Sequence, residues 1–269
     1  MTTPDVPHRF ELELEVPATA EQVWHAIASE EGISAWMMPA EVEPRVGGAV
    51  AFHMGPDEMS HGRVTAFEPG RRFAYEEDWA TLIGQPDADV TPLLTEFLVE
   101  ARSGGTCVVR VVTSAFGTGA DWEGEFWDEM ETGWAPMLDN LRLYLTHFPG
   151  QRVSPLWVGS TFAAAPEAAV AAVRSELGVS GPGDAVNTRG LAGAVERSID
   201  RHFLLRIERP VPGLISVYSF GAEDGSAVHI QGYLFSEGAP AYVEAERAAW
   251  QAWLDGVATD VAAAGAPSA

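Results

Sequence analysis

One carboxylate stands out among the ionisable side chains of this sequence. In the run FAYEEDW, residues 73–79, strand-like alternation places Glu77 on the same face as Tyr75 and Trp79. A charged group on an apolar face is costly unless it is paired or neutralised. Glu77 is therefore a candidate hydrogen-bonding or acid–base group inside a pocket. If the strand instead ends in solvent, Glu77 is an ordinary polar residue at its rim.

Arg110 is the candidate partner for this carboxylate. It interrupts an apolar run, VVRVV at residues 108–112, and could reach Glu77 across a pocket. Both faces of that run are apolar, so the sequence does not show which way Arg110 points. The two arrangements predict opposite effects, because burial would raise the pKa of Glu77 whereas an ion pair with Arg110 would lower it.

Other signals for catalysis or metal binding are missing. The chain has no Gly-rich phosphate loop, no H-E-x-x-H, no C-x-x-C and no G-x-S-x-G. His53 and His61 are the closest histidines in sequence, and alternation predicts that both lie on the outer faces of their strands. A metal site would need them to converge with a carboxylate. We therefore expect no metal and no cofactor.

The elements that must position these residues follow from periodicity. Residues 10–16 alternate apolar and polar side chains, as an edge strand does. A helix is expected from residue 19 or 20, and a second, short helix should end near Trp36 because Pro39 disfavours helix before it. Gly47-Gly48 indicates a bend. Further strands are predicted over residues 49–54, 61–68, 72–79, 93–102 and 106–115, followed by a long amphipathic helix over 122–147.

The second half of the chain repeats this plan in shortened form. A strand around residues 158–162 precedes a helix that starts at Pro166. Three strands are then predicted at about 202–208, 214–220 and 227–235, followed by a helix over 242–257. We read this half as a second, divergent copy of the same fold; an α+β extension unrelated to the first half is the alternative.

Composition limits the classes of partner. The net charge is −23 and all sixteen basic residues are arginine, so nucleic acid and anionic membrane surfaces are poor partners. Residues 1–150 carry 26 acids and 8 arginines, and the rest 13 and 8, which supports a boundary near residue 150. A single cysteine, no apolar run that could cross a bilayer and no visible secretory signal favour the cytoplasm.

Several short motifs occur in a characteristic order. They are Arg45-Val46-Gly47-Gly48 with Phe52, Gly62-Arg63-Val64, Glu68-Pro69-Gly70-Arg71-Arg72-Phe73, Gly133-Trp134 and Leu138-Asp139-Asn140-Leu141. In this order, residues 8–148 resemble the START-like superfamily (SRPBCC, helix-grip fold), in the branch similar to the activator of heat-shock-protein-90 ATPase. The resemblance implies an α+β fold in which a curved antiparallel sheet wraps around a long C-terminal helix. We expect domains at 1–149 and 150–269, with a cavity in the first.

The expected cavity lies between the sheet and the long helix of the N-terminal domain. Phe52 and Tyr75 should face it by alternation, and Met130 and Trp134 share a helix face because they lie one turn apart. Gly133, next to a buried Trp134, should let a strand approach closely. The predicted lining is Trp36, Met38, Phe52, Tyr75, Glu77, Phe97, Met130 and Trp134.

Three functions fit these expectations. The first is binding of a small apolar or aromatic molecule in the cavity, for which adaptable methionines and aromatic rings are suited. The second, implied by the resemblance, is interaction with a protein partner, including a second copy of the chain. The third is a cavity enzyme of cyclase or hydrolase type that uses Glu77, because START-like folds include such activities.

Overall fold

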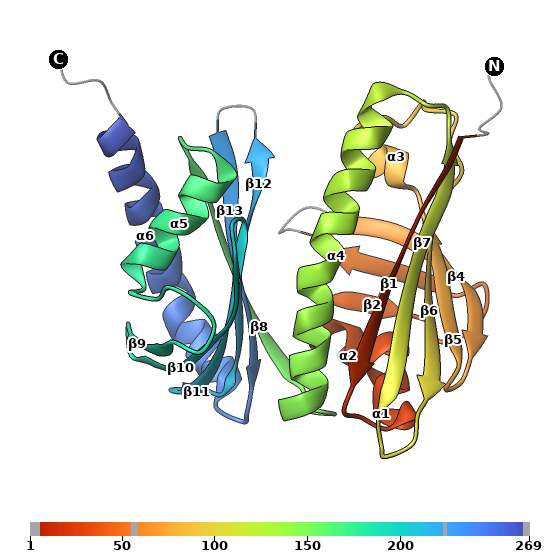
Figure 1. Ribbon diagram of the computed structural model, residues 1–269, viewed down its shortest axis with the longest axis horizontal. Helices are drawn as coiled ribbons and strands as arrows, with labels where there is room; N and C mark the ends of the chain where they lie inside the picture. The colour runs from red at the N-terminus through yellow and green to blue at the C-terminus, as the bar shows by residue number, and fades with distance from the viewer. Residues whose placement is uncertain (1–5, 55–58, 223–224, 266–269) are drawn as a thin grey trace. The chain divides into compact units, whose positions relative to one another are not determined.

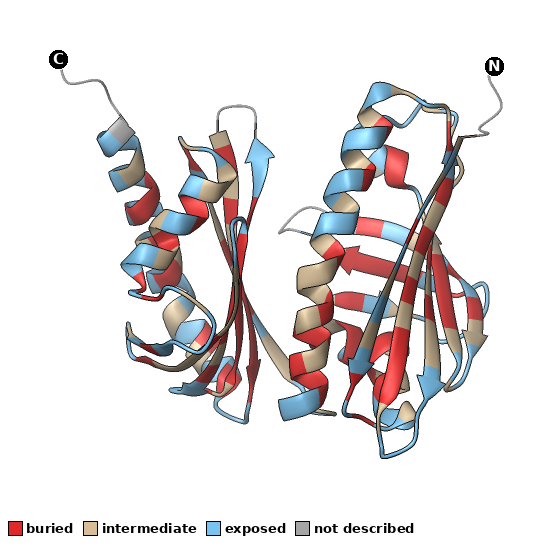
Figure 2. Cartoon of the chain, in the orientation of Figure 1, coloured by how far each residue is buried: buried red, intermediate tan, exposed pale blue. Residues whose placement is uncertain are grey.

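The chain folds into two units, Met1–Gly150 and Gln151–Ala269, each built from one antiparallel sheet and its helices (Figure 1). A computed structural model describes residues 6–54, 59–222 and 225–265. Figure 2 shows buried residues concentrated along the strands of each sheet. None of the described helices is long and apolar enough to cross a membrane. Both units have the helix-grip architecture expected from the sequence.

The N-terminal unit is a seven-stranded antiparallel sheet with the order β1-β7-β6-β5-β4-β3-β2. Two short helices follow the first strand, and the long helix α4 ends the unit. In chain order the elements are β1 Val6–Val16, α1 Ala20–Ala28, α2 Glu30–Ser34, β2 Ala40–Val42, β3 Ala49–His53, β4 Met59–Glu68, β5 Arg72–Glu77, α3 Trp79–Leu82, β6 Leu93–Ala101, β7 Cys107–Gly117 and α4 Asp121–His147.

Local sequence signals explain where several elements start and stop. Thr19 forms a capping box with Gln22 at the start of α1, so two backbone N–H groups at the helix start are satisfied. The Gly-Gly bend is required as well: Gly47 has φ +76°, and a Cβ on Gly48 would lie 2.4 Å from the carbonyl oxygen of Glu43. These glycines let β2 turn into β3.

The strand predicted over residues 72–79 ends earlier than expected. β5 stops at Glu77, and Asp78 accepts a hydrogen bond of 3.1 Å from the backbone N–H of Thr81. This side chain caps the short helix α3, which begins at Trp79. Trp79 therefore belongs to a helix and not to the strand, while Glu77 remains the last residue of β5.

A buried hydrogen bond attaches the C-terminal half of the long helix α4 to the rest of the N-terminal unit. Asn140 donates a buried hydrogen bond of 3.2 Å to the carbonyl oxygen of Trp36, and the Trp36 indole donates to the carbonyl oxygen of Ala26 at 2.9 Å. Pro136 lies inside the helix, where it cannot supply the usual backbone N–H. This break in the hydrogen-bond ladder was not predicted from the sequence.

The surroundings of Gly133 differ from the expectation. A Cβ added at this position would meet no atom within 4 Å apart from its own helix. The prediction that Gly133 permits a close approach by a strand is therefore wrong. Its neighbour Trp134 is buried, with 6% of its surface exposed, as the helical periodicity predicted.

The C-terminal unit is a six-stranded antiparallel sheet with the order β8-β13-β12-β11-β10-β9. Strands β9 and β10 were not predicted, because Gly, Ala, Asn and charged residues replace the usual apolar alternation in them. α5 and α6 contribute to one core with the sheet, through residues such as Val170, Val173, Trp250 and Leu254. The elements are β8 Val153–Phe162, α5 Pro166–Glu176, β9 Ala185–Thr188, β10 Leu191–Ile199, β11 His202–Arg209, β12 Gly213–Ala222, β13 Gly225–Phe235 and α6 Ala239–Gly265.

Candidate functional site

Glu77 is a half-buried carboxylic acid on the inner face of the N-terminal sheet. It pairs with Gly62 of β4 and Leu93 of β6, and the hydroxyl of Ser60 donates a hydrogen bond to its Oε1. Burial raises the pKa of Glu77 from its ordinary value of 4.5 to about 7, against the opposing effect of Ser60. Near neutral pH, both the acid and its conjugate base are therefore well populated.

The main chain opposite Glu77 leaves room for this side chain. A Cβ on Gly62 would lie 3.0 Å from Cγ of Glu77 and 2.3 Å from the carbonyl oxygen of Glu76. These distances are below normal contact, so a larger residue at position 62 would displace the strand or the carboxyl group. The Gly-x-Val motif thus has a physical role beside the acid.

Tyr75 places a neutral phenol on the same face as Glu77. Its ring is buried and tilted against Phe52 at a centroid distance of 5.1 Å. Burial, and then the nearby charge of Glu77, raise the pKa of Tyr75 well above 10, while a hydrogen bond with Thr95 acts in the opposite direction. The phenol therefore stays protonated and can donate a hydrogen bond.

Arg110 does not reach this acid. Its guanidinium lies 3.0 Å from Glu11 and 3.3 Å from Glu13, both on the outer side of β1. The β1–β7 register explains this, because Glu13 stands directly opposite Arg110. The suggested pair between Arg110 and Glu77 is therefore wrong. Among the described residues, Glu77 makes no ion pair, in keeping with its raised pKa.

The eight residues predicted to line the cavity fall into two groups by burial. The five aromatic members are buried: Trp36, Phe52, Tyr75, Phe97 and Trp134. The other three are half-buried: Met38, Glu77 and Met130. Phe97 contacts Trp36 and Trp134 edge to face at 6.3 and 5.8 Å. An enclosed cavity between these residues stays a prediction.

A second aromatic group begins two residues after Glu77. The Trp79 ring lies 5.1 Å from Trp122, 4.8 Å from Phe126 and 5.9 Å from Trp127, measured between centroids. Its indole N–H donates to the carbonyl oxygen of Thr91 at 2.7 Å. Two aromatic residues therefore lie near Glu77 in sequence. Tyr75, two positions before it, contacts Phe52, and Trp79, two positions after it, belongs to this second group.

The two histidines singled out from the sequence lie on neighbouring strands, with His53 opposite Met59 and His61 opposite Ala51. His53 lies 3.2 Å from Glu41 at a partly exposed position, and His61 is exposed on β4. Across residues 6–54, 59–222 and 225–265, no group of three His, Cys, Asp or Glu side chains is arranged to hold a metal ion. Cys107 is a buried free thiol.

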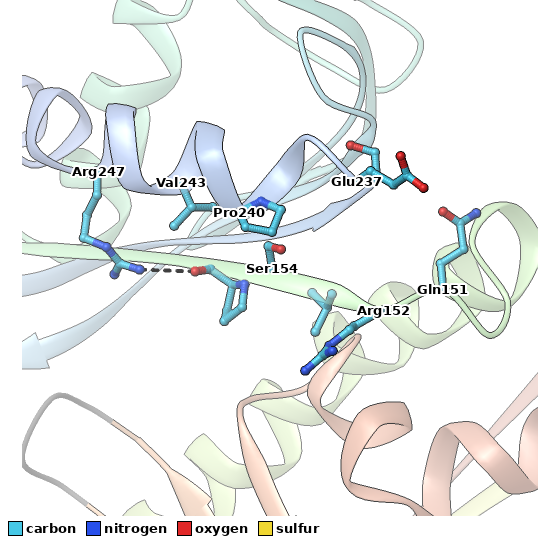
Figure 3. A pocket seen from close by; sticks show the side chains of 10 residues that line it. Gln151, Arg152, Ser154, Glu237, Pro240, Val243 and Arg247 are labelled. Carbon is cyan, nitrogen blue, oxygen red and sulfur yellow. Dashed lines mark hydrogen bonds between the residues drawn. The ribbon is translucent and has the colours of Figure 1, made fainter.

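Two concave regions were not foreseen. A groove of about 780 Å³ in the C-terminal unit lies between the start of β8, the end of β13 and the start of α6 (Figure 3). Arg247 is held there by hydrogen bonds to the carbonyl oxygens of Pro155 and Trp157, at 3.3 and 3.2 Å. Most of its lining residues are exposed, so the groove is open.

The second concave region, of about 230 Å³, lies in the N-terminal unit beside His8 and Trp127. His8 is 3.0 Å from the buried carboxylate of Glu123. Neither His8 nor Glu123 was predicted as a site residue from the sequence. The only sequence signal for Glu123 was its position in the first turn of the long helix, where an acidic side chain interacts favourably with the helix dipole.

Comparison with known proteins gives one family-model match, which lies in the N-terminal unit. Residues 17–146 match the family model described as Activator of Hsp90 ATPase homolog 1-like protein. No curated protein matches the chain. The chain carries the helix-grip fold in both units, and the match to this family model lies within the N-terminal unit.

Solved structures similar to the chain include single-unit and two-unit proteins. MLL2253 from Mesorhizobium loti is 18% identical, covering 52% of this chain and 98% of that one with a TM-score of 0.44. The Aha1 dimer from Colwellia psychrerythraea is 17% identical, covering 53% and 99% with a TM-score of 0.43. The di-domain ARO/CYC BexL from the BE-7585A biosynthetic pathway is 14% identical, covering 97% and 99% with a TM-score of 0.44.

Proposed function

Because residues 17–146 match the family model described as Activator of Hsp90 ATPase homolog 1-like protein, we propose that the N-terminal unit binds a small apolar or aromatic molecule between its sheet and α4. Glu77 orients this molecule through a hydrogen bond. In this proposal the ligand contacts the three half-buried side chains among the predicted lining residues, Met38, Glu77 and Met130.

The state of Glu77 is the observation that carries the proposal. A structural carboxylate on an apolar face would be expected to form an ion pair, and its pKa would then be low. Glu77 instead has a pKa of about 7 and a single hydroxyl partner, Ser60. A partly exposed, partly protonated acid can donate a hydrogen bond to a ligand or accept one from it.

The surrounding side chains indicate the chemical class of the ligand. The buried rings of Phe52, Tyr75 and Phe97 make the inner face of the sheet apolar and aromatic, and the half-buried methionines of the predicted lining can adapt to an irregular ligand shape. Few polar groups accompany Glu77, chiefly Ser60 and the phenol of Tyr75. A mostly apolar molecule with one hydroxyl or carbonyl group fits this arrangement better than a charged one does.

Acid–base catalysis is a second candidate function, favoured by the same pKa. An acid with a pKa near the working pH can both give and take a proton efficiently. Glu77 meets this condition at about 7. The enzyme proposal differs from the binding proposal in one respect: the molecule that leaves the site is chemically altered.

The experiment compares wild type with Glu77→Gln and a matched control, Glu76→Gln, which removes the same charge from the neighbouring position of β5. Each protein is titrated with 1-naphthol, a neutral aromatic alcohol, and binding is followed by tryptophan fluorescence. We expect saturable binding to wild type and to Glu76→Gln, and binding weakened about tenfold in Glu77→Gln, the loss of a charge-assisted hydrogen bond. Equal affinity in all three proteins would contradict the role of Glu77.

Native mass spectrometry of the protein from its own host tests for a natural ligand. A co-purifying small molecule would give its mass directly. Incubating that molecule with wild type and with Glu77→Gln then separates the two candidate functions. A product formed only by wild type supports catalysis, whereas unchanged ligand with both proteins supports binding alone.

A further inference from the structure

Glu123 is a fully buried carboxylate at the start of α4. It receives hydrogen bonds from the backbone N–H and the hydroxyl of Thr118, both at 2.8 Å, from the N–H of Gly119 at 3.0 Å, and from His8 Nε2 at 3.0 Å. Its first-turn position also places it at the positive end of the helix dipole. The site is therefore built to hold a negative charge.

The surrounding backbone is shaped for this carboxylate. A Cβ on Gly117 would lie 2.0 Å from one carboxylate oxygen of Glu123, so only glycine leaves the space that the group occupies. Burial acts to raise the pKa of Glu123, but its hydrogen bonds with Thr118, His8 and Gly119 outweigh that effect and hold the pKa at about 2. Glu123 is ionised throughout the physiological pH range.

An ionised carboxylate fixes the tautomer of His8. Because Glu123 can only accept hydrogen bonds, the ring nitrogen that faces it, Nε2, must carry a proton. In the neutral imidazole the other nitrogen, Nδ1, is then left as a hydrogen-bond acceptor. The orientation of the ring is fixed as well, since it stacks on Trp127 with centroids 5.2 Å apart and planes within 7°.

This oriented imidazole borders a pocket. The side chain of His8 is 17% exposed, so it is not sealed in the core. The pocket, of about 230 Å³, is smaller than typical sites for drug-sized ligands. Its lining is Pro7, His8, Arg9, Phe10, Trp127, Asp128 and Glu131.

The charges around the pocket favour a cation. Arg9 is paired with Glu11, so its charge is already compensated. Asp128 and Glu131 lie on α4 three residues apart, on one helix face, and neither forms an ion pair with another described residue. A basic nitrogen acceptor beside two uncompensated carboxylates suits a ligand that carries positive charge and N–H donors.

We propose that this pocket binds a small organic cation with N–H groups, such as a protonated primary amine. The ligand donates a hydrogen bond to Nδ1 of His8, and Asp128 and Glu131 compensate its charge. Metal binding is a poorer fit, because no three metal-ligating side chains converge among the residues described. The site lies apart from Ser60 and Glu77 in the fold and does not depend on the function proposed for them.

The first test examines the imidazole itself. In protein labelled with nitrogen-15 at histidine, the neutral form of the His8 ring should be the tautomer with a protonated Nε2 and an unprotonated Nδ1. A neutral ring that carries its proton on Nδ1 would overturn the proposal. Glu123→Gln, which can also donate a hydrogen bond, should disturb this tautomer preference; circular dichroism establishes that the variant remains folded.

The second test is a titration with benzylamine followed through the Nδ1 resonance of His8. We expect a saturable shift with wild type and none with benzyl alcohol, which has the same shape without the charge. The double variant Asp128→Asn, Glu131→Gln should weaken binding about fivefold, the upper end of the effect of one exposed ion pair. Glu125→Gln with Glu129→Gln is the matched control, since both are exposed acids of the same helix.

Three results would count against the amine site. If the Nδ1 resonance of wild type shows no saturable shift with benzylamine, the contact between His8 and Glu123 only holds β1 against α4. An equal response to benzyl alcohol would remove the role of charge. Equal weakening in the control double variant would show that net charge alone attracts the amine.

Discussion

The indole of Trp134 meets the ring of Phe97 edge to face, with centroids 5.8 Å apart. Phe97 in turn contacts Trp36 edge to face at 6.3 Å and stacks against Phe73 at 6.5 Å. This chain of rings links α4 to the central strands of the N-terminal sheet. Side chains, and not close backbone approach, therefore determine how α4 is held against the sheet.

Truncation of Trp134 should accordingly be costly. We expect Trp134→Ala to lower the free energy of unfolding by about 3–5 kcal/mol, because it removes a large buried ring and leaves a cavity against Phe97. Urea unfolding at neutral pH measures this change. Trp122→Ala is the control, since Trp122 is half-buried on the same helix and should cost less. A loss below about 1 kcal/mol for Trp134→Ala would contradict the packing.

Glu77→Gln should make the protein more stable above neutral pH. The folded-state pKa of Glu77 is about 7, above its ordinary value of 4.5, so the folded protein holds this proton more tightly than the unfolded chain does. The tighter binding of this proton contributes its full stabilisation of the folded protein below about pH 4.5, and that stabilisation is lost as the pH rises through 7. Glutamine stays neutral, so the gain at alkaline pH is up to about 3 kcal/mol.

Urea unfolding at a series of pH values between these two limits tests the prediction. Wild type should lose stability relative to Glu77→Gln as the pH rises. Glu76→Gln serves as the control for net charge, because it removes a carboxylate from the adjacent position of the same strand. If the free energies of unfolding of wild type and Glu77→Gln differ by the same amount at every pH, the carboxyl group of Glu77 is not buried in the way described.

The sequence alone predicted the strands whose two faces differ clearly. Alternation placed Phe52 and Tyr75 on the inner face, and helical spacing placed Trp134 inward. Glu77 was identified for the same reason, because its position continues the apolar face of β5. Such inferences need only the local period of the chain, which is why they are sound for regular elements.

Features that depend on partners distant in sequence could not be predicted in the same way. Arg110 lies in a strand with two apolar faces, and its pairing with Glu11 and Glu13 follows from the β1–β7 register. The contact between His8 and Glu123 joins residues 115 positions apart. Neither His8 nor Glu123 breaks a local sequence pattern strongly enough to indicate its partner.

Gly133→Ala should stabilise the protein. Gly133 lies inside α4, where alanine is favoured over glycine by about 0.5–1 kcal/mol, and its added methyl group would meet no atom within 4 Å. Gly32→Ala is the contrasting variant, because its Cβ would lie 1.9 Å from the carbonyl oxygen of His25. Thermal unfolding should therefore move in opposite directions for the two variants. Destabilisation by Gly133→Ala would show that a neighbouring group does approach α4 there.

Loss of the Glu123 charge should weaken the protein from neutral to mildly acidic pH. The folded-state pKa of about 2 lies below the ordinary 4.5, so the stability linked to the ionised group is present above about pH 4.5 and is lost as the pH falls through 2. We expect Glu123→Gln to cost about 1–3 kcal/mol at neutral pH, since the amide satisfies fewer of the donors around it.

Gly117→Ala tests the same site from the backbone side. Its methyl group would occupy the position of a Glu123 carboxylate oxygen, so the carboxylate must leave at least part of its hydrogen-bond network. We expect a loss of stability similar to that of Glu123→Gln, and little further loss when the two are combined, because they remove the same interactions. Acid titration of unfolding free energy in the three variants and wild type measures this coupling. Fully additive losses would mean that Gly117 and Glu123 stabilise the protein independently.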